Sequence, residues 1–214
     1  MIVFGSSMSP FVRKVLVFAA EKGIAIEHKP LGLGSDDPDF LSASPFRKMP
    51  ALTDGDFGIS DSSAIVAYLE AVQPSPCLIP TEAKARARTI WFDEFADTIL
   101  GGCGTKIFFN RIVAARFLGR EGDTAVADAA EREELPPILD YLESVIPDSL
   151  FLVEDRLTLA DIAVASLLVN LGHVGCDYGS GRPKLAAFAA AMLARPSLAP
   201  WVERERAFLE RTAA

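Results

Sequence analysis

The sequence predicts an α/β domain followed by an all-helical domain, and three observations support this prediction. In the first third of the chain, short β-like runs alternate with helical patterns. Residues 73–80 contain three prolines, which interrupt a helix and indicate a connecting segment. Beyond that segment, apolar residues recur at helical spacing and strand signals are scarce. We therefore expect domains at residues 1–73 and 83–214, joined by a linker at residues 74–82.

The first domain is expected to contain a mixed four-stranded sheet. Its strand candidates are the short apolar runs at residues 2–5, 24–29, 51–53 and 57–59. Helical patterns cover residues 9–22 and 62–71. The helix between the first two strands implies a parallel β-α-β crossover, because parallel neighbours need a long connection. The turn at residues 54–56 instead predicts an antiparallel hairpin between the last two strands.

A hydroxyl-rich turn precedes the first predicted helix. Ser9 is a favoured N-cap residue, Pro10 suits the first helical position, and Gly23 suits the C-terminal end. The turn also contains Ser6 and Ser7, so unpaired backbone N–H groups and hydroxyls converge at this helix end. Because the positive end of the helix dipole lies there, the turn is suited to an anion such as phosphate, carboxylate or thiolate.

Two further turns of the first domain carry candidate binding residues. Pro50 begins a short strand, where a proline is tolerated and a cis Met49–Pro50 bond is possible. Polar residues then precede the next helix, where Ser60 or Asp61 can act as an N-cap, which accounts for them without a ligand. A ligand with a carboxylate and an ammonium, such as an α-amino acid head group, could also meet the N–H groups, Ser62 and Asp61 there.

The helical half contains one clear helix start and one clear interruption. Thr158 and Asp161 have the spacing of a capping box, in which each side chain bonds the backbone of the other residue. Pro136 and Pro137 lie within an otherwise helical run and should kink or divide it. We assign both features to the architecture of this domain.

Composition restricts the function classes. The 214 residues include 21 basic and 29 acidic side chains, and the net charge of −8 argues against nucleic acid as a partner. No apolar run is long enough to span a bilayer, and no signal peptide is evident, so we expect a cytoplasmic protein without a membrane partner. The scattered Cys77, Cys103 and Cys176 suit reduced thiols, and with only His28 and His173 we expect no metal site.

Four motifs in order resemble the cytosolic glutathione S-transferase family, in its bacterial type with a serine-type active site and an SPF motif. They are SPFVRKV with EKG in the first helix, KMPAL before the third strand, DSSAI at the next helix, and LTLADIAVAS in the helical half. The resemblance covers essentially the whole chain. It implies a thioredoxin-like N-terminal domain that binds glutathione as co-substrate, followed by an all-α domain that supplies most of the second-substrate pocket.

The resemblance also implies roles for individual residues. The family's cis-proline corresponds to Pro50, and the backbone of Met49 would pair with the cysteinyl unit of glutathione. Asp61 and Ser62 would hold the γ-glutamyl end, and Lys48 would approach the glycyl carboxylate. Many relatives carry Glu or Gln where this chain has Asp61, so the shorter side chain changes the reach of that contact.

By the same resemblance, Ser9 is the catalytic residue. It would donate its hydroxyl hydrogen to the glutathione sulfur, and with the helix N-terminus it would lower a thiol pKa that otherwise lies near 8.5. Ser6 and Ser7 are rivals in the same turn, although the family's residue stands directly before Pro-Phe, as Ser9 does. The first 60 residues contain no tyrosine, and no cysteine replaces Ser9, so tyrosine-type and cysteine-type mechanisms are disfavoured.

The second substrate is specified less closely. The family lines its electrophile pocket with the first helices after the linker, which here supply Phe108, Arg111 and Ile112 as candidates. Trp91, Phe95, Phe109 and Asn110 lie in the same helices, and most of the aromatic residues there, Phe108 included, are more typical of ordinary core. The resemblance implies a homodimeric detoxification enzyme that conjugates glutathione to a hydrophobic electrophile. Peroxide reduction, ether cleavage and isomerisation begin with the same thiolate, and a non-catalytic glutathione-binding or interaction module is the alternative from another class.

Overall fold

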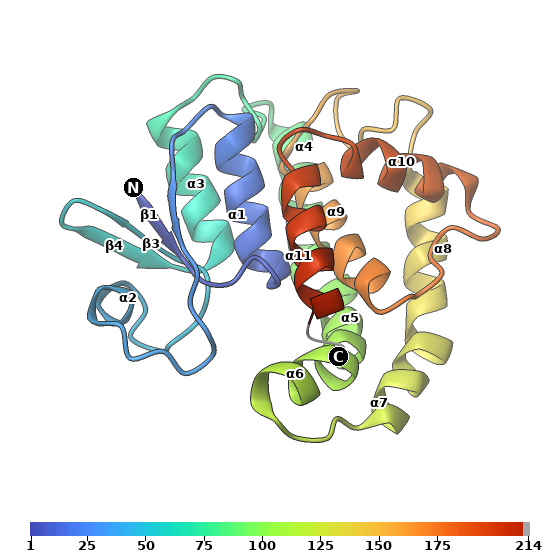
Figure 1. Cartoon of the computed structure of the whole chain (residues 1–214). Helices are drawn as coiled ribbons and strands as arrows, with labels where there is room; N and C mark the ends of the chain where they lie inside the picture. The colour runs from blue at the N-terminus through green and yellow to red at the C-terminus, as the bar shows by residue number, and fades with distance from the viewer. Residues whose placement is uncertain (212–214) are drawn as a thin grey trace.

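The computed structural model, which describes residues 1–211, has an α/β half and a helical half side by side (Figure 1). The four strands are β1 (Ile2–Phe4), β2 (Glu27–Lys29), β3 (Ala51–Asp54) and β4 (Phe57–Ser60). They form one sheet in the order β2-β1-β3-β4, with β1 and β2 parallel and the other pairs antiparallel. The predicted mixed sheet and its crossover are confirmed.

Helices cover both faces of this sheet. Helix α1 (Pro10–Glu21) and helix α3 (Ser62–Val72) pack on the face that presents Val3 and Leu52. The other face presents Phe4 and Ala51 and is covered by helix α2 (Pro38–Ala43). The alternation of side chains along each strand therefore divides the apolar residues between two clusters. Helix α2 was not predicted, since its six residues are too few to show a helical repeat.

In the second half, the regular elements of the described residues are all helices. Its elements are α4 (Ala83–Glu94), η1 (Phe95–Leu100), α5 (Gly101–Phe108), η2 (Phe109–Val113), α6 (Ala114–Leu118), α7 (Thr124–Ala129), η3 (Ala130–Glu134), α8 (Leu135–Val145), α9 (Leu159–His173), α10 (Pro183–Leu193) and α11 (Ala199–Arg211). Helix α9 is buried along nearly its whole length and packs against both α1 and α4. The core of the molecule is therefore continuous across the two halves.

Three segments of the helical half, η1 to η3, are π-helical turns with wider i to i+5 hydrogen bonding. The last of them directly precedes Pro136 and Pro137, which lie in the first turn of α8. The interruption predicted from the two prolines thus takes the form of a change from a π-helical to an α-helical segment.

The capping box at the start of α9 is confirmed. Thr158 and Asp161 bond each other's backbone, and Asp161 also accepts the backbone N–H of Leu152 at 2.8 Å. Burial raises the pKa of the Asp161 carboxyl to about 6, despite these hydrogen bonds. Asp161 therefore ties the start of the central helix to the loop before it.

Candidate active site

Ser9 occupies the N-cap position of α1, as predicted, but its side chain makes no capping bond to that helix. Its backbone is held on both sides, because the Ser9 N–H donates to the Ser6 carbonyl and the Ser9 carbonyl accepts from Arg13, each at 3.0 Å. Pro10 follows at the first helical position. The half-buried hydroxyl of Ser9 is thus left for a ligand at a helix N-terminus that favours negative charge.

The two rival serines are placed differently. The Ser6 hydroxyl accepts the backbone N–H of Met8 at 3.3 Å, which makes it part of the turn itself, although Ser6 also borders the cavity described next. Ser7 is buried and is not among the residues that line this cavity. The geometry therefore favours Ser9 over both neighbours as the hydroxyl that meets a ligand.

A cavity of about 480 Å³ opens beside Ser9, between the two halves of the molecule. Its wall includes Met8, Phe11, Leu31, Leu33, Met49, Phe108, Phe109, Val113, Phe117, Leu167 and Phe208, together with the polar residues Ser6, Thr105 and Asn170. Among the residues described, no charged side chain lines it. The volume and the apolar wall are typical of a site for a small organic molecule.

The edge of the sheet next to this cavity is shaped by Gly5 and by the Met49–Pro50 peptide bond. That bond is cis, as predicted, and Met49 lines the cavity. Gly5 has a φ of +128°, and a Cβ atom there would lie 2.7 Å from Val12 and 3.2 Å from Met49. Only glycine therefore allows the end of β1, the start of α1 and Met49 to approach one another so closely.

Asp61 has a backbone conformation that is rare for a residue with a side chain. Its φ is +86°, and one of its carboxylate oxygens, Oδ1, accepts the N–H groups of Ser63 and Ala64 at 3.0 Å each. Asp61 is therefore the N-cap of α3. The other oxygen, Oδ2, has no hydrogen-bond partner within the described part of the chain and is exposed to solvent. Backbone strain of this kind is commonly kept at ligand sites.

Ser62 and Lys48 lie near this helix end in different environments. Ser62 is buried at the start of α3, and its hydroxyl approaches a carboxylate oxygen of Asp97 at 3.4 Å. Burial raises the Asp97 pKa above its ordinary value, against the opposing charge of Lys14. Lys48 is exposed and forms no ion pair within residues 1–211, while its backbone is held by Ser44. Its ammonium group is thus available to an anionic ligand.

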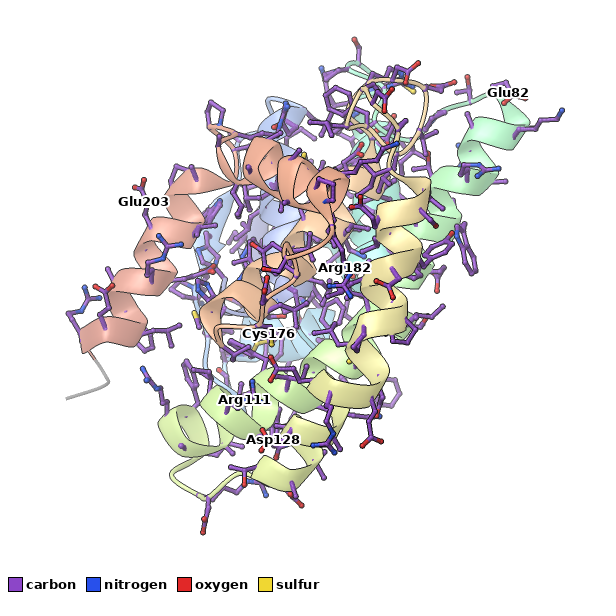
Figure 2. All side chains as sticks on the ribbon, turned by 90° about the vertical axis from the view of Figure 1, so that its right-hand side faces the viewer. Glu82, Arg111, Asp128, Cys176, Arg182 and Glu203 are labelled. Carbon is purple, nitrogen blue, oxygen red and sulfur yellow. The ribbon has the colours of Figure 1, made fainter. Side chains whose placement is uncertain are left out.

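Of the three candidates for the second-substrate pocket, the structure brings only Phe108 to the cavity wall. Arg111 instead forms ion pairs with Asp128 at 2.7 Å and Glu131 at 2.5 Å and approaches Cys176 (Figure 2). Ile112 is buried in a cluster that includes Met8 and Phe108 but does not reach the cavity. The prediction that Arg111 and Ile112 line the second-substrate pocket is therefore wrong for this cavity.

The physical reason for this correction is the π-helical turn η2. In an α-helix, the residues three and four positions after Phe108 share its face, and these are Arg111 and Ile112. In a π-helix the repeat is longer, and here Val113, five positions after Phe108, lines the cavity. Phe109, which lies in the region named from the sequence, and Phe117 also line it, and no α-helical pattern identifies this set.

Other candidate chemistry is absent from the described residues. Cys77, Cys103 and Cys176 are free cysteines, and burial raises the pKa of Cys103 to about 11 and of Cys176 to about 12, so these two are protonated thiols at neutral pH. No group of three His, Cys, Asp or Glu side chains in residues 1–211 is arranged to hold a metal ion. No helix in the same range is long and apolar enough to cross a membrane.

Sequence comparison identifies the family of the chain that contains this site. Residues 3–76 match the sequence model of the glutathione S-transferase N-terminal domain, and residues 108–205 match that of the C-terminal domain. The chain belongs to the glutathione S-transferase family. It is 31% identical over 210 residues to a glutathione S-transferase of Hyoscyamus muticus, covering 95% of this chain and 98% of that protein.

Solved structures of the family agree with this assignment. A human theta-class glutathione transferase, in complex with the glutathione conjugate of 1-menaphthyl sulfate, superposes with a TM-score of 0.87 and 26% identity, covering 99% of this chain and 89% of that one. A glutathione S-transferase from Rhodospirillum rubrum F11 gives a TM-score of 0.85 and 26% identity, covering 94% and 90% of the two chains. The thioredoxin-like domain followed by a helical domain is therefore the transferase fold.

Proposed function

We propose that this transferase activates the thiol of glutathione at Ser9 and conjugates it to a hydrophobic electrophile. The observation that carries the proposal is the Ser9 hydroxyl, which makes no bond to its own helix and lies at the wall of the apolar cavity. A hydroxyl that donates to sulfur and a helix N-terminus both favour the thiolate over the thiol. The thiolate then forms a carbon–sulfur bond, and the leaving group departs with the electron pair of the bond that breaks.

The residues that frame Ser9 support one orientation of glutathione. The Met49 backbone beside the cis bond would pair with the cysteinyl unit, which places the sulfur near Ser9. The free oxygen of Asp61 would accept from the γ-glutamyl ammonium, and the first N–H groups of α3, with Ser62, would hold its carboxylate. Lys48 would meet the glycyl carboxylate. The human theta-class structure holds a glutathione conjugate, which supports a tripeptide of this shape in this fold.

Binding of glutathione by calorimetry and the ultraviolet absorbance of its thiolate test the proposal. The wild-type protein is expected to bind glutathione and to ionise its thiol below the pH at which free glutathione ionises. In Ser9→Ala the tripeptide should still bind, but the thiol pKa should rise and kcat should fall by about 10²-fold, the usual cost of losing one donor to a reacting anion. Ser6→Ala is the matched control, and an equal effect there would move the role to the other serine.

A substrate series decides the reaction type. Turnover of an aryl halide, an organic peroxide and an aryl ether would separate conjugation from peroxide reduction and ether cleavage. We expect conjugation of the aryl halide to be the fastest, because no charged side chain of the described residues lines the cavity to bind a polar second substrate. Binding of glutathione without turnover of any substrate would instead favour a non-catalytic module.

We further propose a cytoplasmic homodimer. Ile90, Trp91 and Ile99 are exposed along α4 and η1, and Phe57 is exposed on β4, and exposed apolar side chains that form a patch mark an interaction surface. A second copy of this chain would cover these side chains. Sedimentation of the wild-type protein should give twice the monomer mass, and Trp91→Glu should shift the protein toward the monomer.

A further inference from the structure

A buried polar network connects the turn that carries Ser9 to the two long helices of the second domain. The Asn170 amide on α9 donates from Nδ2 to the Met8 carbonyl at 3.1 Å, and its Oδ1 accepts from Arg13 at 2.9 Å. Arg13 also donates to the Ser166 carbonyl and forms an ion pair with Glu205 of α11 at 2.6 Å. Arg13, Asn170 and Glu205 are all at most 2% exposed.

The Met8–Ser9 peptide is fixed by this network at both of its polar ends. Its carbonyl accepts from Asn170, and its N–H, which belongs to Ser9, donates to the Ser6 carbonyl. The peptide unit is planar, so two hydrogen bonds determine its orientation. The next carbonyl, that of Ser9, accepts from the backbone N–H of Arg13. The direction of the Ser9 Cα–Cβ bond is therefore set from both sides, and the rotations about the Cα–Cβ and Cβ–Oγ bonds remain.

Asn170 has no equivalent among the other polar groups around this turn. Met8 itself packs against Phe108, Ile112 and Leu209, which are apolar, and within residues 1–211 the side chain that donates to its carbonyl is Asn170. Arg13 retains three acceptor oxygens on Ser166 and Glu205 if Asn170 is removed, so its charge stays partnered. The hydrogen bond to Met8 is thus the part of the network that only Asn170 supplies.

We propose that Asn170 is a positioning residue, which holds the Met8–Ser9 peptide so that the Ser9 hydroxyl meets the glutathione sulfur. This inference rests on the proposed role of Ser9. Asn170 acts through the backbone of Ser9, and Arg13 with Glu205 orients the Asn170 amide. Ionisation of the glutathione thiol therefore depends on the helical domain as well as on the domain that binds glutathione.

The test measures ionisation of bound glutathione without any electrophile, so that the place of Asn170 in the cavity wall does not affect the readout. In Asn170→Ala, the ionisation constant of the bound thiol should fall about fivefold to tenfold, the range expected for one misplaced hydrogen bond. Its dissociation constant for glutathione at a pH where the thiol is protonated should stay near the wild-type value. Asn170→Asp keeps the shape of the side chain and the bond from Arg13 but cannot donate to the Met8 carbonyl. The ionisation constant of the bound thiol should therefore fall in this variant too, which provides the test if the alanine variant fails to fold.

A double-variant cycle separates positioning from a general effect on folding. In a Ser9→Ala background, Asn170→Ala should change the thiol ionisation no further, because both changes remove the same contact. Asn110→Ala is the matched control, since Asn110 also bonds backbone groups on both sides but lies outside the cavity wall. Additive effects of the two changes, or an unchanged thiol in both Asn170 variants, would overturn the inference. Failure of the wild-type protein to bind glutathione would instead overturn the proposed function.

Discussion

Arg13 and Lys14 are neighbours on α1, yet they join the two domains in different ways. Arg13 lies against α9 and α11 and meets one carboxylate, Glu205, which is itself almost fully buried. Lys14 lies toward α4 and η1 and meets two carboxylates, Asp93 at 2.7 Å and Asp97 at 2.8 Å. The Asp97 side chain is 18% exposed, whereas those of Arg13 and Glu205 are at most 1% exposed.

This difference shows how charge balance sets the ionisation of buried acids. Burial opposes ionisation of Glu205, but Arg13 and His173 lower its pKa below the ordinary value of 4.5. Lys14 is shared between two acids, and burial together with the charge of Asp93 raises the pKa of Asp97 above 3.8. One cluster is therefore a closed ion pair, and the other carries one negative charge more than its cation can balance.

Arg13→Met should produce the largest loss of stability. It leaves Glu205 buried without its guanidinium partner, and breaking a buried pair in this way costs about 3–5 kcal/mol of unfolding free energy. Urea unfolding of the wild type and the variant measures this loss. The double variant Arg13→Met/Glu205→Leu removes both charges and should recover most of it. A loss below about 1 kcal/mol would show that this ion pair contributes no more to stability than a solvent-exposed one.

Lys14→Met should cost less unfolding free energy than Arg13→Met, although it leaves two acids without their cation. Asp97 is partly exposed and already has a raised pKa, so it can take up a proton when Lys14 is removed. The loss should therefore shrink as the pH is lowered, which urea unfolding at several pH values would show. A pH-independent loss as large as that of Arg13→Met would contradict the distinction between the clusters.

Acidification should change the contributions of Glu205 and Asp97 to folding stability in opposite directions. The stabilisation from ionised Glu205 is complete above pH 4.5 and is lost as the pH falls through its lowered pKa. The contribution of Asp97 is complete below pH 3.8 and is lost as the pH rises through its raised pKa. On acidification, Glu205→Gln should thus lose less stability than the wild type, and Asp97→Asn should lose more. Equal slopes for the two variants in thermal unfolding would contradict this assignment.

The smallest effect is expected at an exposed pair of the same chemistry. Lys106 and Glu134 approach to 2.7 Å, but both side chains are close to half exposed. Lys106→Ala should change the unfolding free energy by no more than about 0.5 kcal/mol, and added salt should remove that difference. A larger loss would show that burial is not the property that separates Arg13 and Lys14 from surface cations.

Local sequence signals predicted much of the fold and the first part of the site. Ser9 with Pro10 marked the start of α1, Asp61 stood at a helix start, and Thr158 with Asp161 formed the capping box. Each of these depends on residues within three positions of one another, so the sequence contains the whole signal. The cis bond before Pro50 followed from the family resemblance.

What the sequence could not predict depends on distant residues or on an unusual helical repeat. Arg13 and Asn170 are separated by 157 positions, and neither stands in a pattern that identifies its partner. Arg111 and Ile112 were expected at the cavity because the family lines its electrophile pocket with these helices, but the π-helical turn η2 places Val113 there instead. Helix α2 has too few residues to show a period.

The ion pair between Arg13 and Glu205 also has a consequence for the order of synthesis. Arg13 leaves the ribosome with the first helix, and its acid follows only with α11, after all the other described helices. The thioredoxin-like domain can fold early, but its interface with the helical half must wait for the last part of the chain. A nascent or truncated chain without α11 therefore carries an uncompensated cation on α1, so the packing of α1 against the helical half is complete only once α11 is in place.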